Sequence, residues 1–213
     1  MTHSSHTNRA TRLICRVGVC VLVTAATRDT LSAQYIVVGR KIEWRMAAVD
    51  GWVGGSYNQI DEVRKTTNDE RARQLSRAML QEAVKLDAYL VNLDMDGQHT
   101  RTLTSLSVNA AGAFTDEGLI GAWPRFAELV AGEGPSGSTV RILKVTPTKV
   151  GGRRAQECVL ELSLPGGAKM YGAITIVLLS ASRSHLFKLI ADETKFAAAY
   201  RDYHTILASV TYY

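Results

Sequence analysis

Cysteine is scarce in this chain of 213 residues, which contains only three. Cys15 and Cys20 lie near the start and Cys158 lies far from both. No pair has the spacing of a zinc ligand set or of a redox motif. Cys158 alternates with charged neighbours in "ECVLELSL", a pattern that favours a small buried apolar residue over a nucleophile.

Long apolar runs are also lacking. The leading apolar stretch runs only from Leu13 to Ala26 and Arg16 interrupts it, whereas a spanning helix needs about 20 apolar residues. Arg9 and Arg12 precede the stretch, which is the order of charge and apolar core found in a secretory signal peptide. We therefore expect no stable transmembrane anchor in the mature chain.

The expected cleavage site follows Ala33 in "TRDTLSAQ", so residues 1–33 are interpreted as a signal peptide and residues 34–213 as one domain. We thus expect an exported protein, periplasmic or secreted. An organelle transit peptide is the alternative, because no acidic residue precedes Asp29 and Ser, Thr and Arg are frequent. After cleavage only Cys158 remains, so the domain holds no internal disulfide.

The basic charge of the whole chain belongs mostly to this leading segment. Cleavage removes four arginines and one aspartate, which lowers the formal net charge from +5 to +2. A nucleic-acid partner calls for a basic stripe on the mature surface. We therefore expect no nucleic-acid partner.

Catalytic and metal-binding signatures are missing from residues 34–213. His99, His185 and His204 are the only histidines there, and none has a second His or Cys at ligand spacing. The chain also lacks a G-x-S-x-G elbow, an H-E-x-x-H helix and a P-loop. We expect no cofactor, no metal and no enzymatic activity. An unrecognised hydrolase would need His185 or His204 beside a Ser or a carboxylate.

Two stretches imitate ligand-binding motifs. In "NLDMDGQH", Asn92, Asp94 and Asp96 match a calcium loop, but Leu103 stands where the loop needs a bidentate glutamate. Both flanks have strand character, so we predict a hairpin turn at Asp96-Gly97. "GEGPSG" matches the dinucleotide-binding pattern but follows a predicted helix and precedes a strand, which favours a plain loop.

Periodicity predicts three helices in the mature chain. A capping box at Thr67 and Glu70 predicts a helix from Asn68 to about Leu86. Thr115 predicts the start of a second helix that bends at Pro124 and ends at Gly132. The third carries Phe196, Tyr200, Tyr203 and Leu207 at helical spacing.

Two-residue alternation or apolar character predicts seven strands. Five lie in "KIEWRM", "AYLVNLDM", "TRTLTSLSVNA", "STVRILKV" and "ECVLELSL", and two form the hairpin of "KMYGAITIVLL" with "HLFKLIA". The nearly continuous apolar character of the last two suggests central strands covered on both faces. The fold class is therefore α+β: a mainly antiparallel sheet with helices on its faces, an α/β/α sandwich.

Residues 90–213 resemble the PsbP-like superfamily, which includes Mog-type and DcrB-like proteins. The marks are Val108-Asn109 before a helix, "GGRRA" from Gly151 to Ala155 entering a strand, and "ILAS" from Ile206 to Ser209 closing the last helix. The resemblance implies an α/β/α sandwich that binds other proteins and has no common reaction.

These observations together favour an exported, non-enzymatic accessory or protein-binding module of the cell envelope. The alternative is a carrier of a small apolar or lipid ligand, held between the sheet and the kinked helix around Trp123 and Pro124. The residues that we select for a ligand or partner surface are aromatic: Trp44, Trp52, Trp123 and Tyr171.

Overall fold

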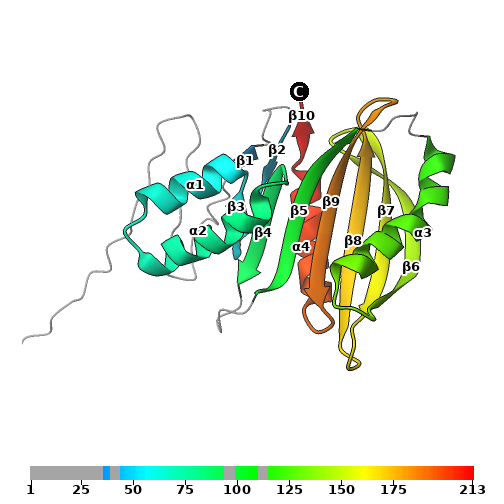
Figure 1. The fold of residues 1–213 in the computed structure, drawn as a ribbon. Helices are drawn as coiled ribbons and strands as arrows, with labels where there is room; N and C mark the ends of the chain where they lie inside the picture. The colour runs from blue at the N-terminus through cyan, green and yellow to red at the C-terminus, as the bar shows by residue number, and fades with distance from the viewer. Residues whose placement is uncertain (1–35, 39–43, 94–98, 110–114) are drawn as a thin grey trace, which may run out of the picture.

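The computed structural model describes residues 36–38, 44–93, 99–109 and 115–213. Its centre is a seven-stranded sheet with the order β3-β4-β5-β9-β8-β7-β6, in which every neighbouring pair is antiparallel (Figure 1). The strands are β3 (Trp52–Gly55), β4 (Ala88–Leu93), β5 (His99–Asn109), β6 (Thr139–Val150), β7 (Arg153–Ser163), β8 (Lys169–Leu178) and β9 (Arg183–Asp192).

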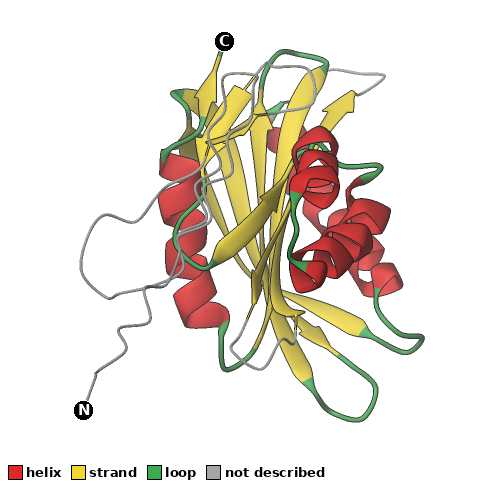
Figure 2. Cartoon of the chain, turned by 90° about the vertical axis from the view of Figure 1, so that its left-hand side faces the viewer, coloured by secondary structure: helices red, strands yellow, loops and turns green. Residues whose placement is uncertain are grey.

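Helices cover both faces of this sheet, as the sequence predicts. On one face lie α1 (Tyr57–Thr66), α2 (Glu70–Ala83) and α3 (Asp116–Glu133), and on the other lies α4 (Phe196–Ala208) (Figure 2). A small sheet with the order β1-β2-β10 adds to the α4 side, and its strands are β1 (Ile36–Val38), β2 (Trp44–Ala47) and β10 (Thr211–Tyr212). The predicted α+β class with a mainly antiparallel sheet is confirmed.

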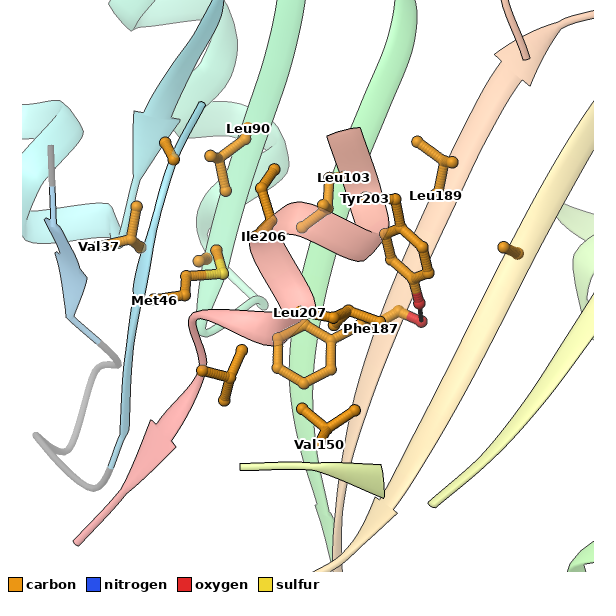
Figure 3. Close-up of a cluster of buried hydrophobic side chains, with 14 of the residues drawn as sticks. Val37, Met46, Leu90, Leu103, Val150, Phe187, Leu189, Tyr203, Ile206 and Leu207 are labelled. Carbon is orange, nitrogen blue, oxygen red and sulfur yellow. Dashed lines mark hydrogen bonds between the residues drawn. The ribbon is translucent and has the colours of Figure 1, made fainter. Parts of the chain in front are cut away.

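The largest core lies between α4, the small sheet and the main sheet (Figure 3). Met46 of β2, Phe187 of β9 and Ile206 of α4 meet there, each almost inaccessible to solvent. Tyr203 donates its hydroxyl proton to Oγ1 of Thr175 within the same core. The predicted helical spacing from Phe196 to Leu207 therefore corresponds to the buried face of α4.

A second core lies under α3, where Leu119, Trp123 and Val130 pack on β7 and β8. The Thr115 side chain accepts from the backbone N–H of Gly118, so the predicted cap is confirmed. The helix continues through Pro124 as far as Glu133, and Gly134 is its C-cap. The predicted end at Gly132 is therefore wrong, and the start of "GEGPSG" is helical.

The helical region before β4 differs from the predicted single helix. α1 and α2 are separated at Thr67, whose backbone is extended and which serves as the C-cap of α1. The cap of α2 is Asp69, whose carboxylate accepts from the backbone N–H groups of Arg71 and Ala72. The Asp69 carboxylate therefore takes the place of the predicted capping box at Thr67. Its negative charge is also stabilised by the positive end of the helix dipole, which a neutral hydroxyl is not.

The hairpin predicted around "NLDMDGQH" is present, since β4 and β5 pair from Ala88 with Ser105 to Leu93 with His99. Asp94, Asp96 and Gly97 lie outside the described residues. The flanks are strands and not the helices of a calcium loop, and Leu103 is a buried core residue of β5.

At the other end of the sheet, β6 is an edge strand with a bulge between Ile142 and Lys144 and with Pro147 further along.

Candidate functional site

Strand β7 is apolar on its α3 face and carries two acids on its α4 face. Cys158 and Leu160 pack in the core under α3, and Leu162, which is also buried, lies on the same face of the strand by the predicted alternation. Glu157 and Glu161 occupy the opposite face, and yet their exposed fractions are only 5% and 7%. Carboxylates are rarely buried to this extent unless they are paired, so each must have partners.

Glu157 lies beneath α4 and is held by three side chains. Its Oε1 accepts a hydrogen bond from the Tyr200 hydroxyl, and its Oε2 accepts one from Oγ1 of Thr175 at 3.2 Å. Nε2 of His204 lies 3.4 Å from the same Oε2. Burial, followed by the hydrogen bond to this carboxylate, raises the pKa of Tyr200. The phenol therefore stays protonated and remains a donor to Glu157.

Glu161 lies further along β7 and is held by an aromatic and two cationic side chains. The Tyr171 hydroxyl donates to its Oε2 at 3.0 Å and Nη2 of Arg141 donates to the same atom at 3.1 Å. Nζ of Lys169 lies 3.5 Å from Oε1. The hydrogen bond from Tyr171, together with that from Arg141, lowers the pKa of Glu161. This carboxylate is therefore ionised at neutral pH.

Four rings form a continuous row above these two carboxylates. Tyr171 of β8 lies with its ring centroid 5.5 Å from that of Phe196, and Phe196 stacks on Tyr200 at 5.3 Å. Tyr200 then meets His204 edge to face at 4.5 Å. We call these four residues the aromatic row. Its members on α4 are four residues apart, so they line one edge of that helix.

α4 reaches β7 at Glu157, but in the described part of the chain no helix covers β6 on this side of the sheet. α4 packs against β2, β5, β8 and β9, whereas β6 and β7 extend beyond it (Figure 1). In the pairing of β6 with β7, Arg141 lies opposite Glu161, Lys144 lies opposite Val159, and Thr146 lies opposite Glu157. We call this surface the β6–β7 strip; it consists of Arg141, Lys144, Thr146, Thr148 and Val159. Arg141 and Lys144 are exposed and the other three are half-buried.

The aromatic residues selected from the sequence do not form one surface, although Trp44 and Trp52 belong to the same core. Trp44 belongs to the core under α4, and Trp52 donates its indole N–H to Asp202 at 3.0 Å. Trp123 fills the space between α3 and the sheet and donates to Oε1 of Gln156 at 3.1 Å. All three are nearly inaccessible to solvent. Tyr171 is half-buried and is the member of this set that belongs to the aromatic row.

The histidines occupy different environments. His185 is fully buried on β9, with Nδ1 3.0 Å from the Tyr212 hydroxyl, and burial lowers its pKa to about 3. His204 is exposed and meets Glu157. The His99 side chain lies outside the described part of the chain. His204 therefore satisfies the carboxylate condition set for a hydrolase, but the contacts described for its ring are to Glu157, Tyr200 and Tyr203, which include no nucleophilic Ser, Thr or Cys.

Cys158 shows no sign of activation, because burial raises the pKa of its thiol to about 11. Within the described ranges, no group of three or more His, Cys, Asp or Glu side chains is placed to hold a metal ion. In the same ranges, no helix has the length and apolar character to cross a bilayer.

Comparisons with known proteins identify the fold. No protein-family model and no curated protein matches this chain. Its structure is similar to cyanobacterial PsbP from Synechocystis, with a TM-score of 0.57 and 10% identity over 90% of this chain and 99% of that one. It is also similar to the Ran-binding protein Mog1p of Saccharomyces cerevisiae, with a TM-score of 0.51 and 8% identity over 85% of this chain and 96% of that one. The predicted PsbP- and Mog-like fold is confirmed.

Proposed function

We propose that this protein is an exported, non-enzymatic accessory module that binds another envelope or secreted protein through the aromatic row and the β6–β7 strip. One observation carries the proposal: a row of contacting rings stands over two buried, fully partnered carboxylates, beside an edge of the sheet that none of the described helices covers. Mog1p, which has the same fold, is a Ran-binding protein, and this is compatible with a protein-binding role.

The network beneath the row supports a binding role because it makes the surface rigid before any partner arrives. Tyr171 and Tyr200 are each fixed at the hydroxyl by a carboxylate and at the ring by Phe196. A side chain that is already ordered loses little conformational entropy on binding. Tyrosine and arginine are also the residues that contribute most often to binding energy at protein interfaces.

The charge of the strip indicates the chemistry of the partner. Arg141 and Lys144 present exposed cationic groups there, and Arg141, like Lys169 of β8, also pairs with the buried Glu161. Glu193, whose Oε1 lies 3.5 Å from the Tyr171 hydroxyl, is an exposed acid at the end of the row. A partner segment with acidic and apolar side chains complements this arrangement.

Export rests on the sequence of residues 1–33, where Arg9 and Arg12 precede a short apolar stretch. N-terminal sequencing of protein isolated from the envelope fraction tests it, and a start at Gln34 is expected. Intact residues 1–33 on a cytoplasmic protein contradict this part of the proposal without affecting the binding surface.

Site-specific photo-crosslinking tests the binding surface. A photoreactive residue replaces Lys144 on the strip, and in a control protein it replaces Lys85, which is exposed beyond the end of α2. In cells of the source organism, we expect a reproducible crosslinked protein at Lys144 that is absent at Lys85. Mass spectrometry then identifies the partner.

The purified partner provides the decisive measurement. Because a reversed charge opposes an acidic partner, Lys144→Glu should weaken binding by roughly 10-fold, and Lys85→Glu should leave it unchanged. Equal crosslinking from both positions, or equal affinity of both charge-reversed variants, contradicts the assignment of the surface. A partner that binds only the α1–α2 face would support the protein-binding function but would contradict the location of the binding site that we propose.

A further inference from the structure

Strands β5 and β9 lie in a gap between two helices on the face of the main sheet that carries α2 and α3 (Figure 1). α2 packs mainly on β4, and α3 packs mainly on β6 and β7. The helix that packs on β5 and β9 is α4, which lies on the opposite face. In the described part of the chain, the middle of the sheet is therefore without its own helix on the α2–α3 side.

The floor of this gap is formed by alternate residues of β5 and β9. Phe187 and Leu189 point into the core under α4, so their neighbours on β9 lie on the other face. Leu106 of β5 lies opposite Leu186 of β9 in the same position across the strands. We call this surface the central strip; it consists of Thr102, Thr104, Leu106, Leu186, Lys188 and Ile190, which are all half-buried. Apolar side chains in the middle of the sheet thus remain partly open to solvent.

The edge of α3 beside the gap adds an exposed apolar side chain. Glu133 marks this edge, because its carboxylate pairs with Nζ of Lys188 on the strip. Leu129 lies about one turn before Glu133 and so on the same edge of the helix. Its exposed fraction is 59%. The apolar surface therefore continues from the strip onto α3.

The edge of α2 on the other side of the gap has the same character. Tyr89 of β4 pairs with Thr104 of the strip, and the charge of Glu82 contributes, after burial, to the raised pKa of its phenol. Glu82 therefore lies on the edge of α2 that is next to the strip. Leu75, which is half-buried, lies two turns before Glu82 and so on the same edge. Each side of the gap thus presents an apolar side chain and an acid.

The gap has the width of one helix. Four strand spacings separate β4, under α2, from β7, under α3. At about 4.8 Å each, these spacings span about 19 Å. Packed helices lie about 8–10 Å apart, so one helix between two others needs about 16–20 Å. A single helix therefore fits between α2 and α3 with its axis over the strip.

The other occupants of such a surface fit less well. β5 is paired with β4 and β9, and β9 is paired with β5 and β8, so neither strand has a free edge to which a further strand could add. The described helices of this chain already bury their apolar faces in their own cores, so a second copy offers no free helix.

We propose that the central strip binds one amphipathic α-helix of another protein, whose apolar face packs on Leu106, Leu186 and Leu129 and whose flanks carry basic side chains towards Glu82 and Glu133. This surface and the aromatic row lie on opposite faces of the sheet. The failure of either proposal therefore does not imply the failure of the other.

Titration of the purified full-length protein with a synthetic peptide tests the proposal. The probe is a peptide of about 14 residues that contains only Leu and Lys, with Leu at the spacing of one helix face. The control peptide has the same composition with Leu and Lys alternating, which is a strand pattern. Backbone amide shifts are followed by nuclear magnetic resonance, and circular dichroism measures the helix content of the peptide.

We expect the helical peptide to shift the signals of residues 104, 106, 129 and 188 saturably, with a Kd of about 0.1 mM or tighter, and to gain helix content on binding. The alternating peptide should cause no saturable shift. Equal binding of the two peptides would reduce the effect to the attraction of charges and would overturn the proposal. The absence of saturable binding by the helical peptide would overturn it as well.

Two variants of α3 locate the binding surface. Leu129→Gln should weaken binding of the helical peptide by at least about 5-fold, because a polar side chain replaces an apolar contact. Ile120→Gln is the matched control, since Ile120 is also 59% exposed on α3. It lies two and a half turns from Leu129, on the opposite edge, and its replacement should change nothing. Thermal unfolding confirms that both variants are folded, and equal responses of the two contradict the proposal.

Two further measurements distinguish the other occupants. A dimer in analytical ultracentrifugation that dissociates in Leu129→Gln would assign the strip to a second copy of the chain. A small apolar molecule that co-purifies with the protein in native mass spectrometry, and is lost in Leu129→Gln, would assign it to a ligand. Either result overturns the proposal, whereas a monomer without a bound molecule leaves the strip accessible to a helix, as we expect.

Discussion

The Tyr200 hydroxyl donates a hydrogen bond to Oε1 of Glu157 and so connects α4 to the middle of β7, 43 residues away in the chain. Glu157 is almost completely shielded from solvent by this contact and by its neighbours. The binding surface that we propose therefore depends on a carboxylate that a partner does not touch.

Tyr200→Phe should lower the free energy of unfolding by about 1–3 kcal/mol, because one carboxylate oxygen of Glu157 loses its donor while remaining buried. Urea denaturation at neutral pH measures the change. Tyr57→Phe is the matched control, since Tyr57 is exposed at the start of α1, and it should have an effect within about 0.5 kcal/mol. Equal stabilities of the two variants would mean that the Tyr200 bond adds nothing.

The protein should lose stability above about pH 10. Burial raises the pKa values of Tyr200, Tyr203 and Tyr212 above the usual 10.0. Above that pH the unfolded chain releases protons that the folded protein retains, so unfolding becomes more favourable as the pH rises. Urea midpoints between about pH 8 and about pH 11 measure this, and the slope above pH 10 should be smaller in Tyr200→Phe. A flat profile up to about pH 11 contradicts it.

His185 should make the protein sensitive to acid. Burial lowers its pKa from 6.5 to about 3, so below pH 6.5 the unfolded chain binds a proton that the folded protein excludes. The stability from this group is complete above pH 6.5 and is lost as the pH falls towards 3. By pH 5 the loss is about 2 kcal/mol.

The variant His185→Phe isolates this effect, because other groups titrate equally in both proteins. It should reduce the change in unfolding free energy between about pH 7 and about pH 5 by about 2 kcal/mol. The absolute stability will also change, since the contact with Tyr212 is lost. Only the difference between the two pH profiles is therefore informative, and parallel profiles would argue against a neutral buried imidazole.

Two glycines should respond oppositely to alanine. Gly54 has a φ of +133°, and a Cβ there would lie 2.2 Å from the carbonyl oxygen of Tyr89, so Gly54→Ala should cost at least about 2 kcal/mol. Gly121 lies inside α3 with open space around it, and Gly121→Ala should stabilise the protein by roughly 0.5–1 kcal/mol. Thermal unfolding of both variants measures the contrast.

The Cys158 thiol should not react with Ellman's reagent in the native protein at neutral pH, because it is buried and its pKa is raised to about 11. A variant with Cys15→Ser and Cys20→Ser leaves it as the only thiol. Full reaction is expected in guanidinium chloride. Rapid labelling without denaturant would show that β7 opens locally.

Local patterns predicted the elements that bury one regular face. The alternation at Cys158, Leu160 and Leu162 and the spacing from Phe196 to Leu207 both correspond to buried faces in the structure. These patterns succeed because an amphipathic period is set by the backbone itself.

The α1 helix was missed because Ile60 is its only fully buried residue. The available signal was the pair Ser56 and Gln59, in which the Gln59 side chain accepts from the Ser56 backbone N–H. Such a pair is the start of a capping box even without an apolar stripe.

The candidate site was also largely hidden from the sequence. Glu157 and Glu161 alternate with apolar residues, which is the usual pattern of a solvent-facing side of a strand. Their burial comes from Tyr171, Tyr200 and Arg141, which reach them through tertiary packing. Tyr171 was selected because it is aromatic, but the row to which it belongs depends on the placement of α4 beside β7.

Strand β2 pairs with β10, so Arg45 lies opposite Thr211 across a sequence separation of 166 residues. Contacts between such distant segments form late, because a long loop must close first. While the chain is being synthesised, Trp44 and Met46 have no core to enter until α4 and β10 have emerged. A newly made chain therefore remains without its main core until residues 196–212 have been synthesised, and this delay favours capture by chaperones.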